Sequence, residues 1–286
     1  MTQADLYFKE TCKRILEEGY SSEGTGVRTR WEEGTEANYI SLVGKVSNVY
    51  DVGKEFPMIT LRNNSKTVKN AIDEILWIWQ KKSNRIKDLH SHIWDQWAGE
   101  DGTIGKAYGY QMAKKYTFKT KDGLKEMDQV DFVRYLIKND PASRRIMTNI
   151  FNFEDLKDMN LEPCAYGTQW LVKGGKLNLI LNQRSQDMLT ANGWNTMQYA
   201  ALLCMFAKEA DLEVGTLTHN IGDCHIYDRH IPLVQMLLDA EPIDVHPKLV
   251  INNPSKNFYD YKVEDFEVQG YDYNKEVKIG KIPVAE

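Results

Sequence analysis

The sequence lacks the features of a membrane-spanning or secreted protein. No stretch approaches the roughly 18 consecutive apolar residues that a transmembrane helix requires. The first residues, Met1 to Leu6, contain neither the basic stretch nor the apolar stretch of a secretory signal. We therefore expect a cytoplasmic protein with no membrane partner.

Cysteine is scarce, and an excess of positive charge is absent. The four cysteines form no Cys-x-x-Cys pair, which argues against a structural zinc site and predicts free thiols in a reducing compartment. His90 and His92 form an H-x-H pair with no third ligand in view, so we expect no metal site. Thirty-six basic against 41 acidic side chains give a formal charge of −5. Proteins that bind nucleic acid by neutralising phosphates usually carry a basic excess, so a nucleic-acid partner is not expected.

The chain also has no internal repeat, low-complexity tract or Pro/Ser-rich linker, so we expect one domain, residues 1–286. With 42% apolar and 27% charged residues, its composition is that of an ordinary globular protein. Apolar spacing predicts helices at 4–19, 67–80, 130–138 and 197–210, and strands at 38–46 and 145–151. Trp77 and Trp79 lie in one of these helices and are assigned to the core. Because helices and strands are interspersed without strict alternation, the pattern indicates an α/β protein of the mixed α+β type, with a mixed sheet flanked by helices.

The clearest local signal is a β-hairpin. Two strand-like segments, 168–172 and 177–181, flank the sequence Lys173-Gly174-Gly175-Lys176. Gly-Gly suits a two-residue type I′ turn, because both central residues of that turn need a positive φ.

This hairpin makes a prediction about Cys164. If Lys173 pairs with Lys176, Cys164 lies opposite Ser185 and beside Arg184, unless a β-bulge shifts the register. A neighbouring guanidinium favours the thiolate and so predicts a nucleophilic thiol. The alternative is that Cys164 is a small buried apolar residue and Arg184 a surface charge.

Short motifs follow one another over nearly the whole chain in a characteristic order. They are Asp73-Glu74-Ile75-Leu76-Trp77, Ile93-Trp94-Asp95-Gln96-Trp97, Ala107-Tyr108-Gly109, Asp140-Pro141-Ala142-Ser143-Arg144-Arg145, Pro163-Cys164, Gln183-Arg184-Ser185-Gln186-Asp187, Asn195, Gly222-Asp223-Cys224-His225-Ile226-Tyr227, Phe258-Tyr259-Asp260-Tyr261, Asp265-Phe266, Gly270-Tyr271 and Pro283-Val284-Ala285. Together these motifs resemble the thymidylate synthase family. The resemblance implies that family's fold, a largely antiparallel or mixed sheet flanked by helices.

The resemblance also implies a reaction, the reductive methylation of dUMP to dTMP. The cosubstrate is 5,10-methylenetetrahydrofolate, which supplies one carbon and a hydride and leaves as dihydrofolate. Cys164 would attack C6 of the uracil and make C5 nucleophilic, since covalent catalysis divides a difficult substitution into easier steps. Glu74 would assist proton transfers around O4 and the folate, and Tyr108 the removal of the C5 proton. The implied catalytic set is completed by Arg184, Asp187 and Asn195.

The phosphate of dUMP is a dianion, for which arginine is suited because its fork of donors stays charged. By resemblance, Arg28, Arg184 and Ser185 come from one subunit. Arg144 and Arg145 come from its partner. The family arrangement therefore implies a homodimer.

Recognition of the base depends on Asn195, whose amide offers a donor for O4 and an acceptor for N3–H of uracil. Relatives that act on cytosine nucleotides carry aspartate there, so Asn195 favours dUMP. His225 and Tyr227 would hold the sugar hydroxyl, and Gln186 and Asp187 complete the implied nucleotide site.

The folate site implied by the resemblance contains Asp187, which would bond to the pterin, with Trp94 and Trp97 beside it. The tail 284–286, including Ala285, would close over the bound substrates and exclude water.

Some positions depart from the family pattern and leave two alternatives open. Ala165 stands where most relatives have histidine, and the segment 189–195 differs from the usual approach to the asparagine. One alternative is a dUMP hydroxymethylase, in which water replaces hydride in the last step. The other is a non-catalytic nucleotide- or RNA-binding module on the same scaffold.

Overall fold

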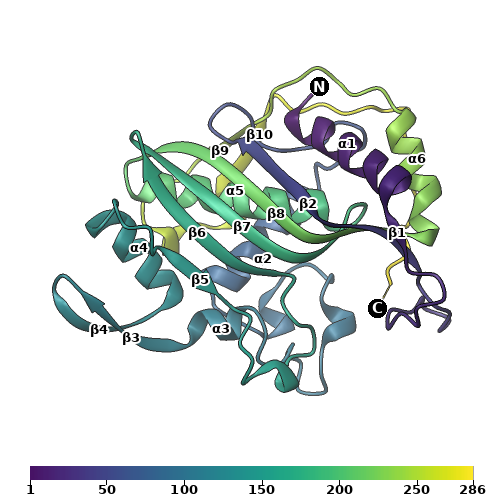
Figure 1. The fold of residues 1–286 in the computed structure, drawn as a ribbon. Coiled ribbons are helices and arrows are strands. Elements are labelled where there is room, and N and C mark those ends of the chain that lie inside the picture. Colours follow the sequence, from purple (N-terminus) through teal and green to yellow (C-terminus); the bar gives the residue numbers. More distant parts are fainter. Residues whose placement is uncertain (286) are drawn as a thin grey trace.

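The computed structural model describes residues 1–285, in which a six-stranded mixed sheet is the largest element (Figure 1). Its strand order is β1-β2-β8-β7-β6-β5, and all neighbours are antiparallel except β7 and β8. These strands are β1 (Tyr20–Ser21), β2 (Tyr39–Asp51), β5 (Met147–Asn149), β6 (Ala165–Lys173), β7 (Lys176–Asp187) and β8 (Glu213–Tyr227). Two small sheets are formed by β3 (Lys115–Thr120) with β4 (Gly123–Asp128) and by β9 (Lys248–Ile251) with β10 (Phe266–Gln269).

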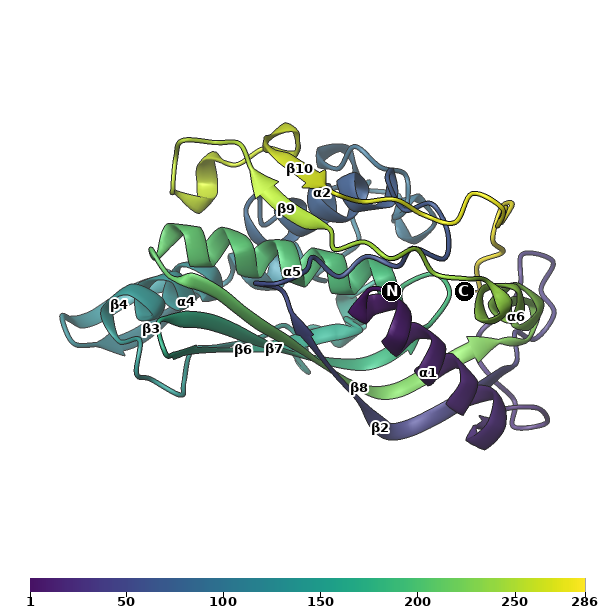
Figure 2. The same ribbon diagram turned by 90° about the horizontal axis from the view of Figure 1, so that it is seen from above.

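Helices cover one side of the large sheet. Figure 2 shows α5 lying along the strands, α2 beyond it, and α1 crossing β2 and β8 on the same side. The helices are α1 (Gln3–Glu18), α2 (Thr67–Trp79), α3 (Gly109–Ala113), α4 (Gln129–Asn139), α5 (Asn192–Glu209) and α6 (Ile231–Asp239). The predicted class, a mixed sheet flanked by helices, is confirmed. Across residues 1–285, no helix has the length and apolar character needed to cross a membrane.

The core lies between the sheet, α5 and α2. Trp79 meets Trp170 of β6 and Phe206 of α5 edge-on, with ring centroids 6.2 Å and 6.0 Å away. All three side chains are fully buried, as is Trp77, so the assignment of Trp77 and Trp79 to the core is confirmed. α5 is buried on most of its circumference because it lies between the sheet and α2, which explains its nearly continuous apolar sequence.

Three predicted helices, 4–19, 67–80 and 130–138, agree with α1, α2 and α4 to within one residue at each end. The prediction that the next helix starts at residue 197 is wrong, because α5 starts at Asn192. Its first turn carries polar residues that face the candidate site, so the apolar pattern on which the prediction depended begins one turn later.

The strand predictions were less accurate. β2 continues to Asp51, beyond the predicted end at residue 46. The prediction ended too early because a register shift between Val43 and Val46 interrupts the alternation of the strand. Gly44, in this interruption, has a φ of +65°, which a residue with a side chain rarely adopts. The strand predicted at 145–151 is shorter, at 147–149.

The hairpin between β6 and β7 has the predicted Gly-Gly turn, with positive φ at both glycines and Lys173 paired with Lys176. The prediction that Cys164 lies opposite Ser185 is wrong. A register shift at Tyr166 inserts one extra residue into β6, so the backbone N–H of Arg184 donates to the carbonyl of Cys164 at 2.9 Å. The thiol residue and the guanidinium residue are therefore directly paired.

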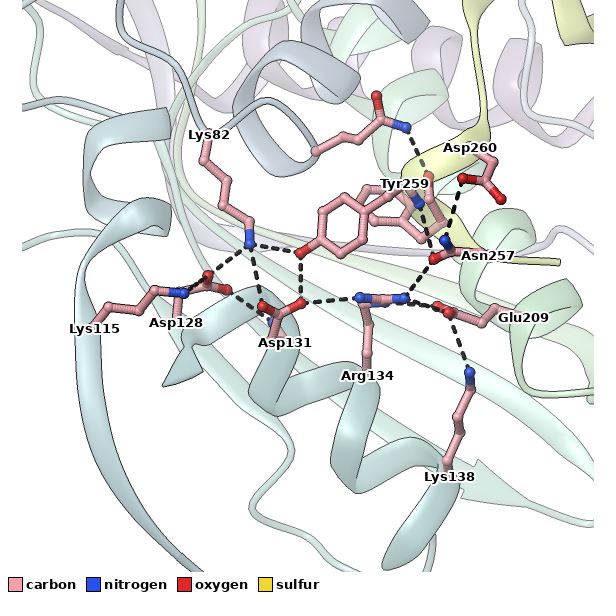
Figure 3. A network of polar contacts seen from close by, with 12 residues as sticks. Lys82, Lys115, Asp128, Asp131, Arg134, Lys138, Glu209, Asn257, Tyr259 and Asp260 are labelled. Carbon is pink, nitrogen blue, oxygen red and sulfur yellow. Dashed lines mark hydrogen bonds and ion pairs between the residues drawn. The ribbon is translucent and has the colours of Figure 1, made fainter. Parts of the chain in front are cut away.

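A network of charged side chains joins α4 to the end of α5 and to the segment around Tyr259 (Figure 3). Arg134 donates two hydrogen bonds to the Glu209 carboxylate, Nε at 2.8 Å and an Nη at 2.5 Å. Lys138 also reaches Glu209, at 3.2 Å. Burial raises the pKa of Glu209, but Arg134 and Lys138 outweigh burial and hold it below its usual range. The charged form of the buried Glu209 carboxylate is therefore stabilised by Arg134 and Lys138.

Replacing Arg134 by methionine is expected to lower the free energy of unfolding by about 3 kcal/mol, because Glu209 is left buried with Lys138 alone. The measurement is the midpoint and slope of urea unfolding. As a control, Lys13→Met removes one partner of the exposed Lys13–Glu17 pair and is expected to change stability by less than about 0.5 kcal/mol. Equal effects of the two substitutions would show that the network around Glu209 stabilises the fold no more than an exposed ion pair does.

Candidate active site

The parallel pairing of β7 with β8 brings two distant motifs together. Ser185 pairs with Asp223, and Asp187 pairs with His225. On the other side of β7, the chain enters β6 directly after Cys164. Three segments that are far apart in the sequence therefore meet at one end of the sheet.

Cys164 lies against Tyr108, which comes from the start of α3. The backbone N–H of Cys164 donates to the Tyr108 hydroxyl at 3.2 Å. Tyr108 has a φ of +44°, a strained conformation for a residue with a side chain. The next residue has to be glycine, because a Cβ on Gly109 would lie 2.0 Å from the carbonyl oxygen of Ser83. Strain of this kind is typical of residues held in place for function.

The charge environment of Cys164 differs from the sequence-based expectation. Burial raises the pKa of its thiol above the usual value, whereas Arg184 and Arg28 act to lower it. The two arginines thus act in the predicted direction, but burial outweighs them, and the expected gain in thiolate is not found. In this structure the Arg184 guanidinium donates to the carbonyls of Pro163 and Glu162, at 3.1 Å and 2.9 Å.

Glu74 projects from α2 into the same region. Its side chain is buried, and its Oε2 accepts a hydrogen bond of 2.6 Å from the indole N–H of Trp194. Burial raises the pKa of Glu74 to about 7, although the bond from Trp194 opposes the shift. A carboxyl group with a pKa near 7 can both accept and donate a proton at neutral pH. Burial also raises the pKa of Tyr108, which therefore stays neutral.

The Asn195 side chain is held in one orientation. Its Oδ1 accepts bonds from Gln183 at 3.1 Å and Gln186 at 3.4 Å, and its Nδ2 donates to Gln198 at 3.0 Å. Within residues 1–285, two buried atoms nearby, Gln198 Nε2 and Gln186 Oε1, have no hydrogen-bond partner. Buried polar atoms are nearly always paired, so this donor and this acceptor fit a polar ligand such as the edge of a pyrimidine base.

Asp187, His225 and Tyr227 lie beside each other near the ends of β7 and β8. Asp187 accepts bonds from the side chain of Thr190 at 2.6 Å and the backbone of Leu189 at 2.8 Å. His225 bonds to Asp223 through Nδ1 at 2.8 Å, and its ring lies 5.0 Å from that of Tyr227.

His230 was not identified from the sequence, yet it connects Asp187 with the C-terminal tail. Its Nδ1 lies 3.4 Å from Asp187 Oδ2, and its Nε2 bonds to the carbonyl of Pro283 at 2.8 Å. Burial raises the pKa of Asp187, but His230, helped by His225 and Thr190, outweighs burial and holds the pKa below its usual range. The tail thus reaches this side of the site at Pro283, while the part of the tail prediction concerning Glu286 falls outside the described residues.

Trp94 borders Tyr108, and Trp97 lies beside Trp94. The ring of Trp94 lies 5.0 Å from that of Tyr108 and 5.3 Å from that of Trp97. By contrast, His90 bonds to Asp73 and His92 to Asp95. In the described part of the chain, no group of three His, Cys, Asp or Glu side chains is placed to hold a metal ion.

The arginines predicted to bind phosphate are not all gathered in one chain. Arg28 is exposed and acts on the Cys164 thiol by its charge. Arg144 and Arg145 lie in the loop before β5, exposed, and their side chains form no hydrogen bond or ion pair with residues 1–285. The structure therefore does not bring these two residues to Cys164 of the same chain.

Comparisons with known proteins agree with one another. The family model described as thymidylate synthase matches residues 6–282. The thymidylate synthase of Bacillus mojavensis and thymidylate synthase 1 of Bacillus subtilis strain 168 are each 43% identical to this chain over 275 residues, which is 95% of this chain and 96% of theirs. The solved structure of the thermostable thymidylate synthase A from Bacillus subtilis matches with a TM-score of 0.90 and 40% identity, over 99% of both chains. These matches give no support to the hydroxymethylase alternative.

Proposed function

Because the chain belongs to the thymidylate synthase family of folate-dependent methyltransferases, we propose that it methylates dUMP with 5,10-methylenetetrahydrofolate as the donor of both the carbon and the hydride. The observation that carries this proposal is the meeting of Cys164, Tyr108 and Glu74 from three separate elements. A nucleophile, a phenol and a carboxyl with a pKa of about 7 are the groups that this chemistry needs.

We assign Cys164 as the nucleophile. Its sulfur forms a bond to C6 of uracil, and the electron pair of the C5–C6 double bond moves toward O4, which makes C5 able to attack the one-carbon unit. Tyr108, next to the thiol, is placed to assist loss of the C5 proton. Glu74 is placed to move protons at the O4 side and at the folate, since its pKa lies near neutral pH.

The nucleotide would be held by groups already described. Asn195 Nδ2 keeps one hydrogen free of the bond to Gln198 and would donate it to O4. Its Oδ1 would accept from N3–H in place of the long bond of 3.4 Å from Gln186. Arg184 uses two of its five N–H donors on the carbonyls of Pro163 and Glu162, so the others remain to bind the phosphate dianion. The remaining assignments to the dUMP site are Arg28, Ser185, Gln186, Asp187, His225 and Tyr227.

On the folate side we assign Asp187, Trp94, Trp97 and Ala285. The aromatic pair next to Tyr108 supports this assignment, because a pterin and its ring substituent need flat apolar surfaces. The bond between His230 and Pro283 supports the assignment of the tail, because it keeps the last described residues near Asp187.

We further propose a cytoplasmic homodimer in which each chain is one domain. The sheet face opposite α5 supports the dimer, because it carries apolar and amide side chains, including the 44% exposed Val49 together with Asn182 and Asn220. The side chains of Arg144 and Arg145 have no hydrogen-bond or ion-pair partner among residues 1–285 and would reach the phosphate of the other subunit. A reducing compartment suits a catalytic thiol and four unpaired cysteines.

The proposal is tested by mixing the purified protein with dUMP and 5,10-methylenetetrahydrofolate. We expect dihydrofolate, followed by its absorbance, and a nucleotide whose mass has increased by one methyl group. A hydroxymethylated nucleotide with tetrahydrofolate would contradict the hydride step. No product at all, with a known thymidylate synthase active in parallel, would contradict methylation itself.

A further inference from the structure

Trp194 makes an unusual contact with Glu74. It lies in the first turn of α5, next to Asn195, and its indole N–H donates to Glu74 Oε2 at 2.6 Å. Glu74 lies on α2, which packs directly against α5, so two buried helices fix the two ends of the bond. The two residues are 120 positions apart in sequence.

No cation compensates Glu74. Among residues 1–285, no lysine, arginine or histidine forms an ion pair with it, and its shortest hydrogen bond comes from Trp194. Trp94 and Gln198 also lie near enough to lower the pKa of Glu74, though less than Trp194 does. A neutral donor stabilises a buried carboxylate less than a cation does and so leaves it able to gain a proton near neutral pH.

The other groups around Glu74 vary little in charge over this range. Burial raises the pKa of both Tyr108 and Tyr199, so both stay neutral. Asp73, the neighbour of Glu74 on α2, is bonded to His90, whose side chain is 81% exposed.

From these contacts we propose that Trp194 is a positioning residue that orients the Glu74 carboxylate and sets the pH at which it takes up a proton. This inference deepens the proposed function, because it depends on the role assigned to Glu74 there. Trp194 does not need to touch the reacting atoms. It acts through Glu74, as part of the hydrogen-bonded group that α5 presents to the site.

The test is the variant Trp194→Phe, which keeps an aromatic ring but removes the N–H. The titration of Glu74 is followed by the infrared carbonyl band of its protonated carboxyl, identified as the band that disappears in Glu74→Gln. Loss of the donor destabilises the carboxylate, so the midpoint is expected to rise by about one pH unit, equivalent to about 1.4 kcal/mol. In a plot of kcat against pH, the inflection due to Glu74 is also expected to move to higher pH.

Two controls make the result specific. Trp79→Phe removes an indole from the same core without touching the Trp194–Glu74 bond, and His90→Gln changes the partner of Asp73, the neighbour of Glu74. Neither is expected to move the midpoint. Trp194→Tyr retains a hydrogen-bond donor and is expected to shift the midpoint less than Trp194→Phe. If both Trp194 variants are folded and leave the midpoint unchanged, the inference is wrong. Failure of the wild-type protein to form dTMP would instead contradict the proposed function, since the infrared titration needs no activity.

Discussion

Replacement of Cys164 by serine is expected to lower kcat for dTMP formation by about a thousandfold or more. The two side chains are similar in size, but a hydroxyl group is a far weaker nucleophile toward C6 because it ionises at a much higher pH. The carbonyl of Cys164 and the N–H of Arg184 remain paired through the backbone, so the geometry of the strand end is unchanged by the substitution. Binding of dUMP, measured by calorimetry, is therefore expected to change by less than about tenfold.

The control for this experiment is Cys204→Ser. Cys204 lies on α5, is a free thiol, and has its pKa raised to about 12 by burial, so it offers no thiolate near neutral pH. We expect this variant to retain kcat to within about twofold. If Cys164→Ser kept a comparable turnover, covalent catalysis by Cys164 would be wrong. Loss of dUMP binding in that variant would point to a structural role of the cysteine.

The parts of the fold that could be predicted are those determined by local sequence. The helix at 67–80 follows from apolar spacing, and the turn at Gly174-Gly175 follows from the need for positive φ. The bulge at Tyr166 could not be predicted, since an extra residue in a strand leaves no reliable pattern. For a related reason the first turn of α5 was missed, because its polar residues serve the site and not the core.

For the candidate site, the sequence predicted neighbours along a strand but not contacts between helices. Cys164 and Arg184 were placed together because a hairpin joins them. The bond between Trp194 and Glu74 depends on how α5 packs on α2, and the position of His230 depends on where the tail returns. Trp194 had been noted only as a departure from the family pattern. Contacts of this kind need the tertiary structure, since no spacing rule connects residues 53 or 120 positions apart.

The predicted sharing of Arg144 and Arg145 between subunits leads to a second large effect. The double variant Arg144→Ala/Arg145→Ala is expected to lose at least about a hundredfold in kcat/KM for dUMP, because two charge-assisted bonds to the phosphate disappear. Mixing it with Cys164→Ser, under conditions that exchange subunits, is expected to restore activity. In each mixed dimer, one site combines an intact Cys164 with intact arginines from the other chain. Random pairing therefore gives about one quarter of the wild-type activity.

The matched control is a mixture of Cys164→Ser with Glu74→Gln. Cys164 and Glu74 belong to the same site of the same chain, since both lie close enough to Tyr108 to raise the pKa of its hydroxyl. Every site in such a mixed dimer carries one of the two defects, so this mixture is expected to stay inactive. Restoration in the arginine mixture but not in the control requires that the arginines cross the interface. No restoration in either, once subunit exchange has been verified by mass spectrometry, would show that Arg144 and Arg145 do not complete the site of the other subunit.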